Sequence, residues 1–139
     1  MSVDNLQELL RKFADERDWN QFHTPRNLIL AIQAELGELS ELVQWVPDSE
    51  ITEQWVQDNN ERLREEIADV FLYLIRLSDV LNIDLIDAAF KKIDLNADKY
   101  PVALAKSNAA KYTELGDIGS QGGAPLRHFE SSIDSNNNA

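Results

Sequence analysis

Proline and glycine are scarce through the first 115 residues, and this scarcity restricts the fold more than any other feature. Only Pro25, Pro47 and Pro101 interrupt this stretch, and Gly37 is the only glycine before Gly116. Between these residues the apolar side chains recur at the three- and four-residue spacing of amphipathic helices, and no stretch alternates as a strand does. The sequence therefore predicts an all-α fold.

Four helices are expected, each bounded by a capping residue or a proline, over residues 3–18, 24–45, 60–81 and 84–100. Thr24 is a favourable N-cap, and Pro25 suits the first position of a helix. Asp84 is a second favourable N-cap. Residues 48–59 are expected to form a loop with one helical turn around residues 51–56.

The length of the chain is that of one ordinary domain. It has 139 residues, 43% of them hydrophobic, which allows a core of its own. From Gly116 onward glycine, serine, asparagine and proline dominate. We therefore expect one domain over residues 1–115 and a flexible tail over residues 116–139. Cysteine is absent, which excludes disulfides, a thiolate nucleophile and a thiolate zinc site.

Charge and targeting signals restrict the partners. The first residues have no basic start followed by an apolar run, and the longest nearly apolar stretch, residues 67–77, is too short to span a bilayer. We expect a cytoplasmic protein without a membrane partner. The formal net charge of -12 also argues against nucleic acid. A triphosphate substrate fits this charge if several carboxylates bind cations.

Two pairs of acids interrupt the apolar stripes of the second and third expected helices. On a helical wheel Glu35 lies about 20° from Leu28, within the apolar stripe. Glu66 occupies the corresponding position on the third helix. Glu38 and Asp69 follow three residues later, each about 60° away at the edge of its stripe.

The matching positions of these acids suggest that the two helices face each other with the carboxylates converging. A buried carboxylate must take up a proton, pair with a cation or bind a metal, and Mg²⁺ prefers oxygen ligands. A di-iron site would need a Glu-x-x-His pair, and neither His23 nor His128 follows an acid at that spacing. The alternative is that the acids are surface charges on ordinary amphipathic helices.

The ordered set of motifs resembles the MazG-like all-α nucleoside triphosphate pyrophosphohydrolases, and within them the dCTP pyrophosphatase group. The resemblance covers roughly residues 6–115. It rests on ELGE at 35–38 followed by EIAD at 66–69, on the segment from RDWNQFH to ELVQW at 17–45, and on EEIADVFLYLIRL, IDLNADKYP and KYTEL.

The resemblance implies a four-helix MazG-like bundle and hydrolysis of a nucleoside triphosphate to the monophosphate and pyrophosphate by an activated water. It assigns Mg²⁺ binding and catalysis to Glu35, Glu38, Glu66 and Asp69. It also places one group of residues near the phosphates, namely Asn96, Lys99 and Tyr100, with Lys92 and Asp94 as weaker candidates.

A base pocket is implied in the same way. Trp19 and Trp45 match aromatic positions that hold the cytosine ring in dCTP pyrophosphatases, although both could be ordinary core or interface aromatics. Tyr73 is expected to touch the sugar. Leu10 stands where some members have a histidine, which puts strict cytosine specificity in doubt. Further candidates by position are Phe22, His23 and Asn27, of which His23 could serve only to cap a helix.

The third expected helix is apolar around nearly its whole circumference, which indicates burial on all sides. Its apolar residues include Ile67, Phe71, Leu72, Leu74 and Ile75. One subunit cannot cover every face, so we expect a homo-oligomer. The family resemblance favours a tetramer, and a dimer is the alternative.

Several functions are compatible with these features. The first is removal of dCTP or modified dCTP from the nucleotide pool. Hydrolysis of dUTP or other non-standard triphosphates is the second, and a phosphoribosyl-ATP pyrophosphohydrolase is a more distant option that the Trp19 and Trp45 pair opposes. A catalytically silent helical module that binds a nucleotide or a protein is the alternative from another class. The intact set of four acids favours an enzyme.

Overall fold

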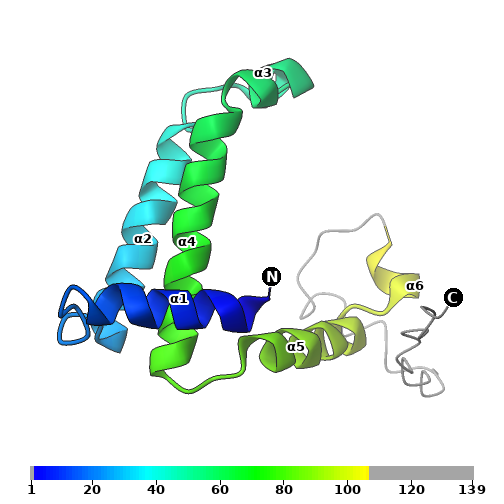
Figure 1. Cartoon of the computed structure of the whole chain (residues 1–139). Coiled ribbons are helices and arrows are strands. Elements are labelled where there is room, and N and C mark those ends of the chain that lie inside the picture. The colour runs from blue at the N-terminus through cyan, green and yellow to red at the C-terminus, as the bar shows by residue number, and fades with distance from the viewer. Residues whose placement is uncertain (1, 107–139) are drawn as a thin grey trace, which may run out of the picture. The chain divides into compact units, whose positions relative to one another are not determined.

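The computed structural model describes residues 2–106 and is all-helical over that range (Figure 1). No strand occurs among these residues, so the all-α prediction is confirmed for them. The predicted tail, residues 116–139, lies outside the described part. The elements are α1 (Val3–Asp15), α2 (Pro25–Glu41), the 3-10 helix η1 (Asp48–Glu50), α3 (Glu53–Asp58), α4 (Asn60–Val80), α5 (Leu85–Lys99) and α6 (Val102–Ala105).

The chain divides into two compact units, residues 1–91 and residues 92–139. The first unit contains α1 to α4 and the start of α5, and the second contains the rest of α5 and α6. Each unit is described by itself.

The helices begin at the expected capping residues. The Thr24 hydroxyl accepts a hydrogen bond from the backbone N–H of Asn27 at 3.3 Å, and Pro25 occupies the first helical position of α2. The Asp84 carboxylate accepts from the backbone N–H of Asp87 at 2.9 Å at the start of α5. These side chains satisfy backbone donors that have no partner within the helix. Both predicted N-caps are confirmed.

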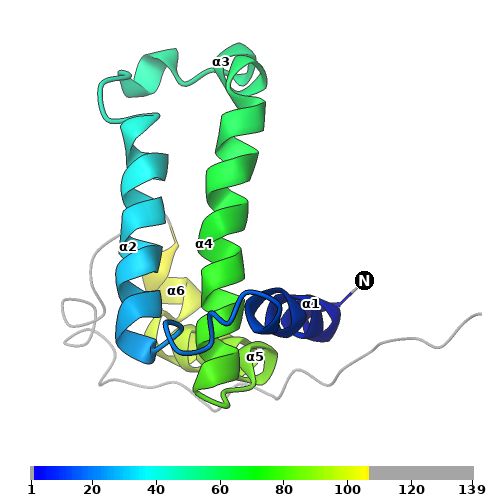
Figure 2. The same cartoon turned by 60° about the vertical axis from the view of Figure 1, so that its left-hand side comes forward.

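The first unit is organised around α2 and α4, which run antiparallel and side by side in both views (Figures 1 and 2). Helix α1 packs across α4, and the short α3 contacts it as well. Among residues 2–106, the buried apolar side chains are Ala14, Leu28 and Ile75 on these helices and Leu42, which directly follows α2. This arrangement places the acid-bearing segments of α2 and α4 opposite each other.

Two helices are shorter than predicted. Helix α1 ends at Asp15 because Asp18 adopts a left-handed conformation with φ of 53°, and the N–H of Trp19 returns to the carbonyl of Ala14 at 2.9 Å. Helix α2 ends at Glu41, and its apolar pattern continues through turns as far as Trp45. Turns that reuse helical spacing cannot be told from a helix by periodicity alone.

The segment between α2 and α4 contains η1 and α3, so it is more ordered than the expected loop with one helical turn. The Thr52 hydroxyl caps α3 by accepting from the N–H of Trp55 at 3.3 Å. Helix α6, only four residues long after Pro101, was not predicted. Elements this short carry too few residues to show a period.

Helix α4 shows how little of the apolar surface one chain covers. Ile75 is fully buried, whereas Ile67 remains 55% exposed and Phe71 43% exposed. Leu74 is exposed as well. Despite this apolar character, none of the helices within residues 2–106 is long and apolar enough to cross a membrane. Apolar side chains of α4 therefore remain exposed in the described chain.

Candidate active site

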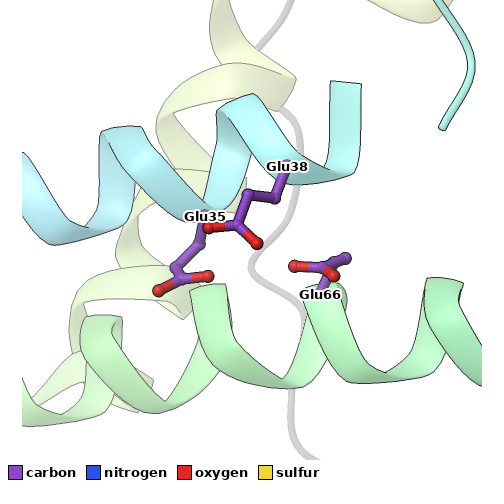
Figure 3. Close-up of side chains that lie close together, drawn as sticks. All are labelled: Glu35, Glu38 and Glu66. Carbon is purple, nitrogen blue, oxygen red and sulfur yellow. The ribbon is translucent and has the colours of Figure 1, made fainter. Parts of the chain in front are cut away.

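Three of the four predicted acids converge between α2 and α4. Figure 3 shows Glu35 and Glu38 on α2 directed toward Glu66 on α4, and one oxygen from each carboxylate lies within 4.8 Å of the others. Glu35 and Glu66 are half-buried and Glu38 is exposed. Such a set of oxygen donors fits a hard divalent cation such as Mg²⁺.

The electrostatics of this acidic cluster, defined as Glu35, Glu38 and Glu66, are unfavourable for three ionised groups. Burial raises the pKa of Glu35, and the negative charges of Glu38, Asp69 and Glu66 raise it further. Within residues 2–91, no ion pair involves any of the three carboxylates. A bound cation would relieve this repulsion.

The fourth predicted acid, Asp69, lies one turn further along α4 and is exposed. It is not part of the group of three whose oxygens lie within 4.8 Å. Its charge nevertheless acts on both neighbours, because it raises the pKa of Glu35 and, after burial and the charge of Glu35, that of Tyr73. Asp69 therefore borders the cluster in this structure.

A cleft of about 450 Å³ opens beside the acids. Its polar lining includes Glu35 and Asp69 from the acidic side and His23 from the loop between α1 and α2. The remaining lining residues are mostly apolar or aromatic: Leu6, Leu9, Leu10, Phe13, Trp19, Leu72, Tyr73 and Arg76. The volume falls within the range of small-molecule sites.

The loop between α1 and α2 positions the predicted aromatic residue Trp19. Its carbonyl accepts from the N–H groups of Phe22 at 2.8 Å and His23 at 3.0 Å, which forms a tight turn. The Trp19 ring lies edge-on to Phe13, with centroids 5.8 Å apart, and to the His23 ring at 6.1 Å. This packing holds Trp19 at the rim of the cleft, where it is 44% exposed.

A polar network joins the loop between α1 and α2 to α4. The Arg76 guanidinium donates from Nε to His23 Nδ1 at 3.1 Å and from Nη1 to Asp79 at 2.7 Å, and Nη2 donates to the Asn20 side-chain oxygen. Asp79 also accepts from Arg11. The Arg11 hydrogen bond is the main cause that holds the pKa of Asp79 below its usual range.

Similarity to known proteins identifies the family of this chain. A model of the MazG-like family matches residues 30–115. The chain belongs to the MazG-like family. It is 44% identical over 115 residues to dCTP pyrophosphatase 1 of Mus musculus, which covers 82% of this chain and 68% of the mouse protein. It is 45% identical to the Homo sapiens protein of the same name, with the same coverage.

The fold of this MazG-like chain is also found in a solved structure. The crystal structure of a pyrophosphatase from Archaeoglobus fulgidus DSM 4304 matches it with a TM-score of 0.67 and 40% sequence identity. The match covers 70% of this chain and 91% of the archaeal chain. The predicted resemblance to nucleoside triphosphate pyrophosphohydrolases of the dCTP pyrophosphatase group is confirmed by these relatives.

Within the first unit, some predicted site residues of this MazG-like chain do not line the cleft. Trp45 follows α2, is 86% exposed and does not line the cleft. Phe22 is exposed, and Asn27 donates a side-chain hydrogen bond to the Phe22 carbonyl at 2.9 Å. The other residues belong to the second unit, where they are exposed: Lys92, Asp94, Asn96, Lys99 and Tyr100.

Arg76 is a charged cleft residue that the sequence analysis did not single out. It lines the cleft, and only 8% of the residue is exposed. A usable signal was present, because Asp69, Tyr73 and Arg76 follow at spacings of four and three and so share one face of α4. Asn20 was also missed, because a loop asparagine carries no periodic signal.

Proposed function

We propose that this chain hydrolyses dCTP or a modified dCTP to the monophosphate and pyrophosphate in a Mg²⁺-dependent reaction that removes such nucleotides from the pool. One observation carries the proposal. A group of convergent carboxylates with no base among residues 2–91 to neutralise it opens onto an aromatic-lined cleft of about 450 Å³. The names of the mouse and human relatives support the choice of deoxycytidine triphosphate.

We assign the divalent cation to Glu35, Glu38 and Glu66, with Asp69 as a fourth ligand or neighbour. The oxygen-only donor set and the raised pKa of Glu35 support this assignment. Bound Mg²⁺ would supply positive charge to offset that of the triphosphate. The acidic chain would otherwise repel such a substrate.

The protein residues would then orient the substrate and accept a proton. Water attacks one of the two phosphorus atoms that flank the oxygen between the α- and β-phosphates. The bond from that phosphorus to the bridging oxygen breaks, the oxygen leaves with the other phosphate group, and the products are the monophosphate and pyrophosphate. A carboxylate at the edge of the cluster takes up the proton of the attacking water. No covalent enzyme intermediate is required. In this proposal Asn96, Lys99 and Tyr100 contact the phosphates.

The base and the sugar would occupy the aromatic side of the cleft. Trp19 offers an indole face of the kind on which bases stack, and Tyr73 is half-buried next to the acids. We assign the sugar to Tyr73. Trp45 does not reach this cleft within one chain, so its predicted contact with the base requires a second subunit.

We further propose that a second copy of the chain covers the exposed apolar faces of α2 and α4, in a homo-oligomer for which a tetramer is favoured. Support comes from large apolar side chains on both helices that stay at least 39% exposed: Ile29, Leu30, Leu36, Ile67, Phe71 and Leu74. Large apolar side chains exposed on two neighbouring helices are typical of an interaction surface. Light scattering that shows a monomer at micromolar concentration would contradict the proposal.

The function is tested by measuring pyrophosphate release with Mg²⁺ from dCTP, 5-methyl-dCTP, dUTP, dTTP, CTP and ATP. We expect fast release from the deoxycytidine compounds alone. Comparable release from many triphosphates would make this a broader pyrophosphohydrolase and would point to Leu10, which lines the cleft, as a cause of relaxed selectivity. No release from a folded oligomer would contradict the proposal in favour of a silent binding module.

A further inference from the structure

We propose that Arg76 is a positioning residue that fixes the neutral His23 ring in the tautomer with its proton on Nε2. His23 thereby presents a hydrogen-bond donor to an acceptor atom of the substrate's pyrimidine. The second step rests on the proposed function, whereas the tautomer follows from the protein alone.

Arg76 is held on three sides. Its Nε, Nη1 and Nη2 atoms donate to His23, Asp79 and Asn20 respectively, and only 8% of the residue is exposed. Two of these partners lie 53 and 56 residues away in the sequence, so the tertiary fold sets the orientation of the guanidinium. Asp79, itself bonded to Arg11, anchors the remaining side. A planar group with three occupied edges cannot rotate away from the His23 ring.

The chemistry of arginine then determines the state of the imidazole. A guanidinium carries only donors and stays charged, so the ring nitrogen that faces it must be an acceptor. In the neutral ring, an unprotonated Nδ1 leaves the proton on Nε2. A proton on Nδ1 would place two donors against each other, and a doubly protonated ring would also face the guanidinium with a second positive charge. Burial, followed by the charge of Arg76, lowers the pKa of His23 in agreement with this state.

The position of the His23 ring in the cleft allows this tautomer to donate a hydrogen bond to a substrate. His23 lines the cleft together with Trp19 and Tyr73, and the Trp19 ring stands edge-on to it at 6.1 Å. With Nδ1 occupied by Arg76, the Nε2–H is the remaining polar group of the ring, and it can only donate. Cytosine offers acceptors at O2 and N3, whereas uracil carries a donor at N3. A fixed donor therefore suits a cytosine edge.

The first test is made on the unmodified chain without substrate, and a variant serves only to assign the signals. The chain has only 2 histidines, so the imidazole nitrogens of His23 can be assigned by ¹⁵N NMR with the His23→Phe variant as reference. We expect one protonated nitrogen at Nε2 and one acceptor nitrogen at Nδ1, without averaging between tautomers. A proton on Nδ1, or two averaged signals, would overturn the proposal whether or not the chain hydrolyses any triphosphate.

The second test separates positioning from mere structure. Arg76→Lys keeps the charge but loses the planar fork, so the His23 ring should average its tautomers and the KM for dCTP should rise about tenfold, the loss of one hydrogen bond, with kcat nearly unchanged. His23→Phe should raise KM by a similar factor. Because Arg76 acts through His23, the double variant should show no further increase. Additive effects would overturn the positioning role.

Arg11→Met is the matched control. It removes the other guanidinium bonded to Asp79 but leaves the contact between Arg76 and His23 in place. We expect the wild-type tautomer and the wild-type KM in this variant. An altered tautomer in Arg11→Met would mean that the whole network, and not Arg76, sets the ring, which would overturn the assignment.

Discussion

Two polar clusters border the same cleft, and they shift the pKa values of their carboxylates in opposite directions. In the acidic cluster three carboxylates face one another across α2 and α4, and burial with like charges raises the pKa of Glu35. In the network at the end of α4, two guanidinium groups surround Asp79 and hold its pKa below the usual range, although the carboxylate is also buried.

The difference lies in the counter-ions. The charge of Asp79 is compensated within the chain, whereas the charges of the acidic cluster are not compensated by any base among residues 2–91. Asp79 has its counter-ions within the chain, so the network is complete without a ligand and can serve as a scaffold for His23. The acidic cluster has no such partner among residues 2–91, and its repulsion is the driving force for taking up a cation. On α4, Glu66 of the acidic cluster lies about three to four turns from Arg76 and Asp79 of the network.

The largest expected effect is on the acidic cluster. Glu66→Gln removes one charge and one ligand, so we expect the turnover number to fall roughly 10³-fold while the helices remain formed. Without metal the variant should melt at a slightly higher temperature than the wild type, because carboxylate repulsion is relieved. Pyrophosphate release and thermal denaturation in EDTA measure the two quantities.

Glu65→Gln is the control for this substitution, because the neighbouring Glu65 is exposed and lies outside the cluster. It should retain wild-type turnover and melting temperature. Turnover of Glu66→Gln near that of the wild type would remove Glu66 from the set of ligands.

The second prediction concerns the network in which Arg76 bonds to Asp79 and His23. Arg76→Met leaves the buried Asp79 with one counter-ion fewer and His23 without its donor, so we expect a loss of about 3–5 kcal/mol in the free energy of unfolding. Urea denaturation measures this loss. Arg64→Met, at an exposed position on the same helix, should change stability by less than about 0.5 kcal/mol. Equal effects of the two substitutions would show that the network does not stabilise the fold.

The third prediction concerns the cation itself. Mg²⁺ at about 100 times its dissociation constant should stabilise the wild type by about 2.7 kcal/mol, because the ion binds the folded chain alone. The gain should be much smaller in Glu66→Gln and unchanged in Arg11→Met. Thermal denaturation across a Mg²⁺ titration measures it. A wild-type melting temperature that is independent of Mg²⁺ would contradict a preformed metal site.

The smallest expected effect concerns acid stability. Asp79 has a lowered pKa in the folded chain, so it contributes stability above the ordinary aspartate pKa that is lost as the pH falls through the folded value. Arg11→Met should raise the pKa of Asp79 and move the acid unfolding midpoint to higher pH. Circular dichroism against pH follows the transition. Lys12→Met, which breaks only an exposed 3.8 Å pair with Glu16, should leave the midpoint in place.

Local signals predicted the helices well and their ends less well. Thr24 and Asp84 cap α2 and α5 as expected, because a side-chain oxygen that accepts a backbone N–H acts within a few residues. The end of α2 was missed because the apolar pattern continues from Glu41 through turns to Trp45. Periodicity reports which side chains share a face, and turns can maintain it.

The candidate site was predictable where it depends on helical faces. Glu35 and Glu66 were expected to converge because each interrupts an apolar stripe, and the structure places their oxygens within one 4.8 Å group with Glu38. Asp69 was expected to join them, but it is not part of that group in this structure. The stripe indicates which way a side chain points, but it does not set its distance to a group on another helix.

The sequence by itself determined the helical content, the two capped helix starts and the acids that interrupt apolar stripes, because these depend on contacts within one or two turns. Only the tertiary structure decided that Arg76 meets His23 and Asn20, that Trp19 lines the cleft while Trp45 does not, and that Asp79 is compensated by Arg11. These contacts join residues more than 50 positions apart, and they depend on how α1 and its loop pack on α4, which no periodicity encodes.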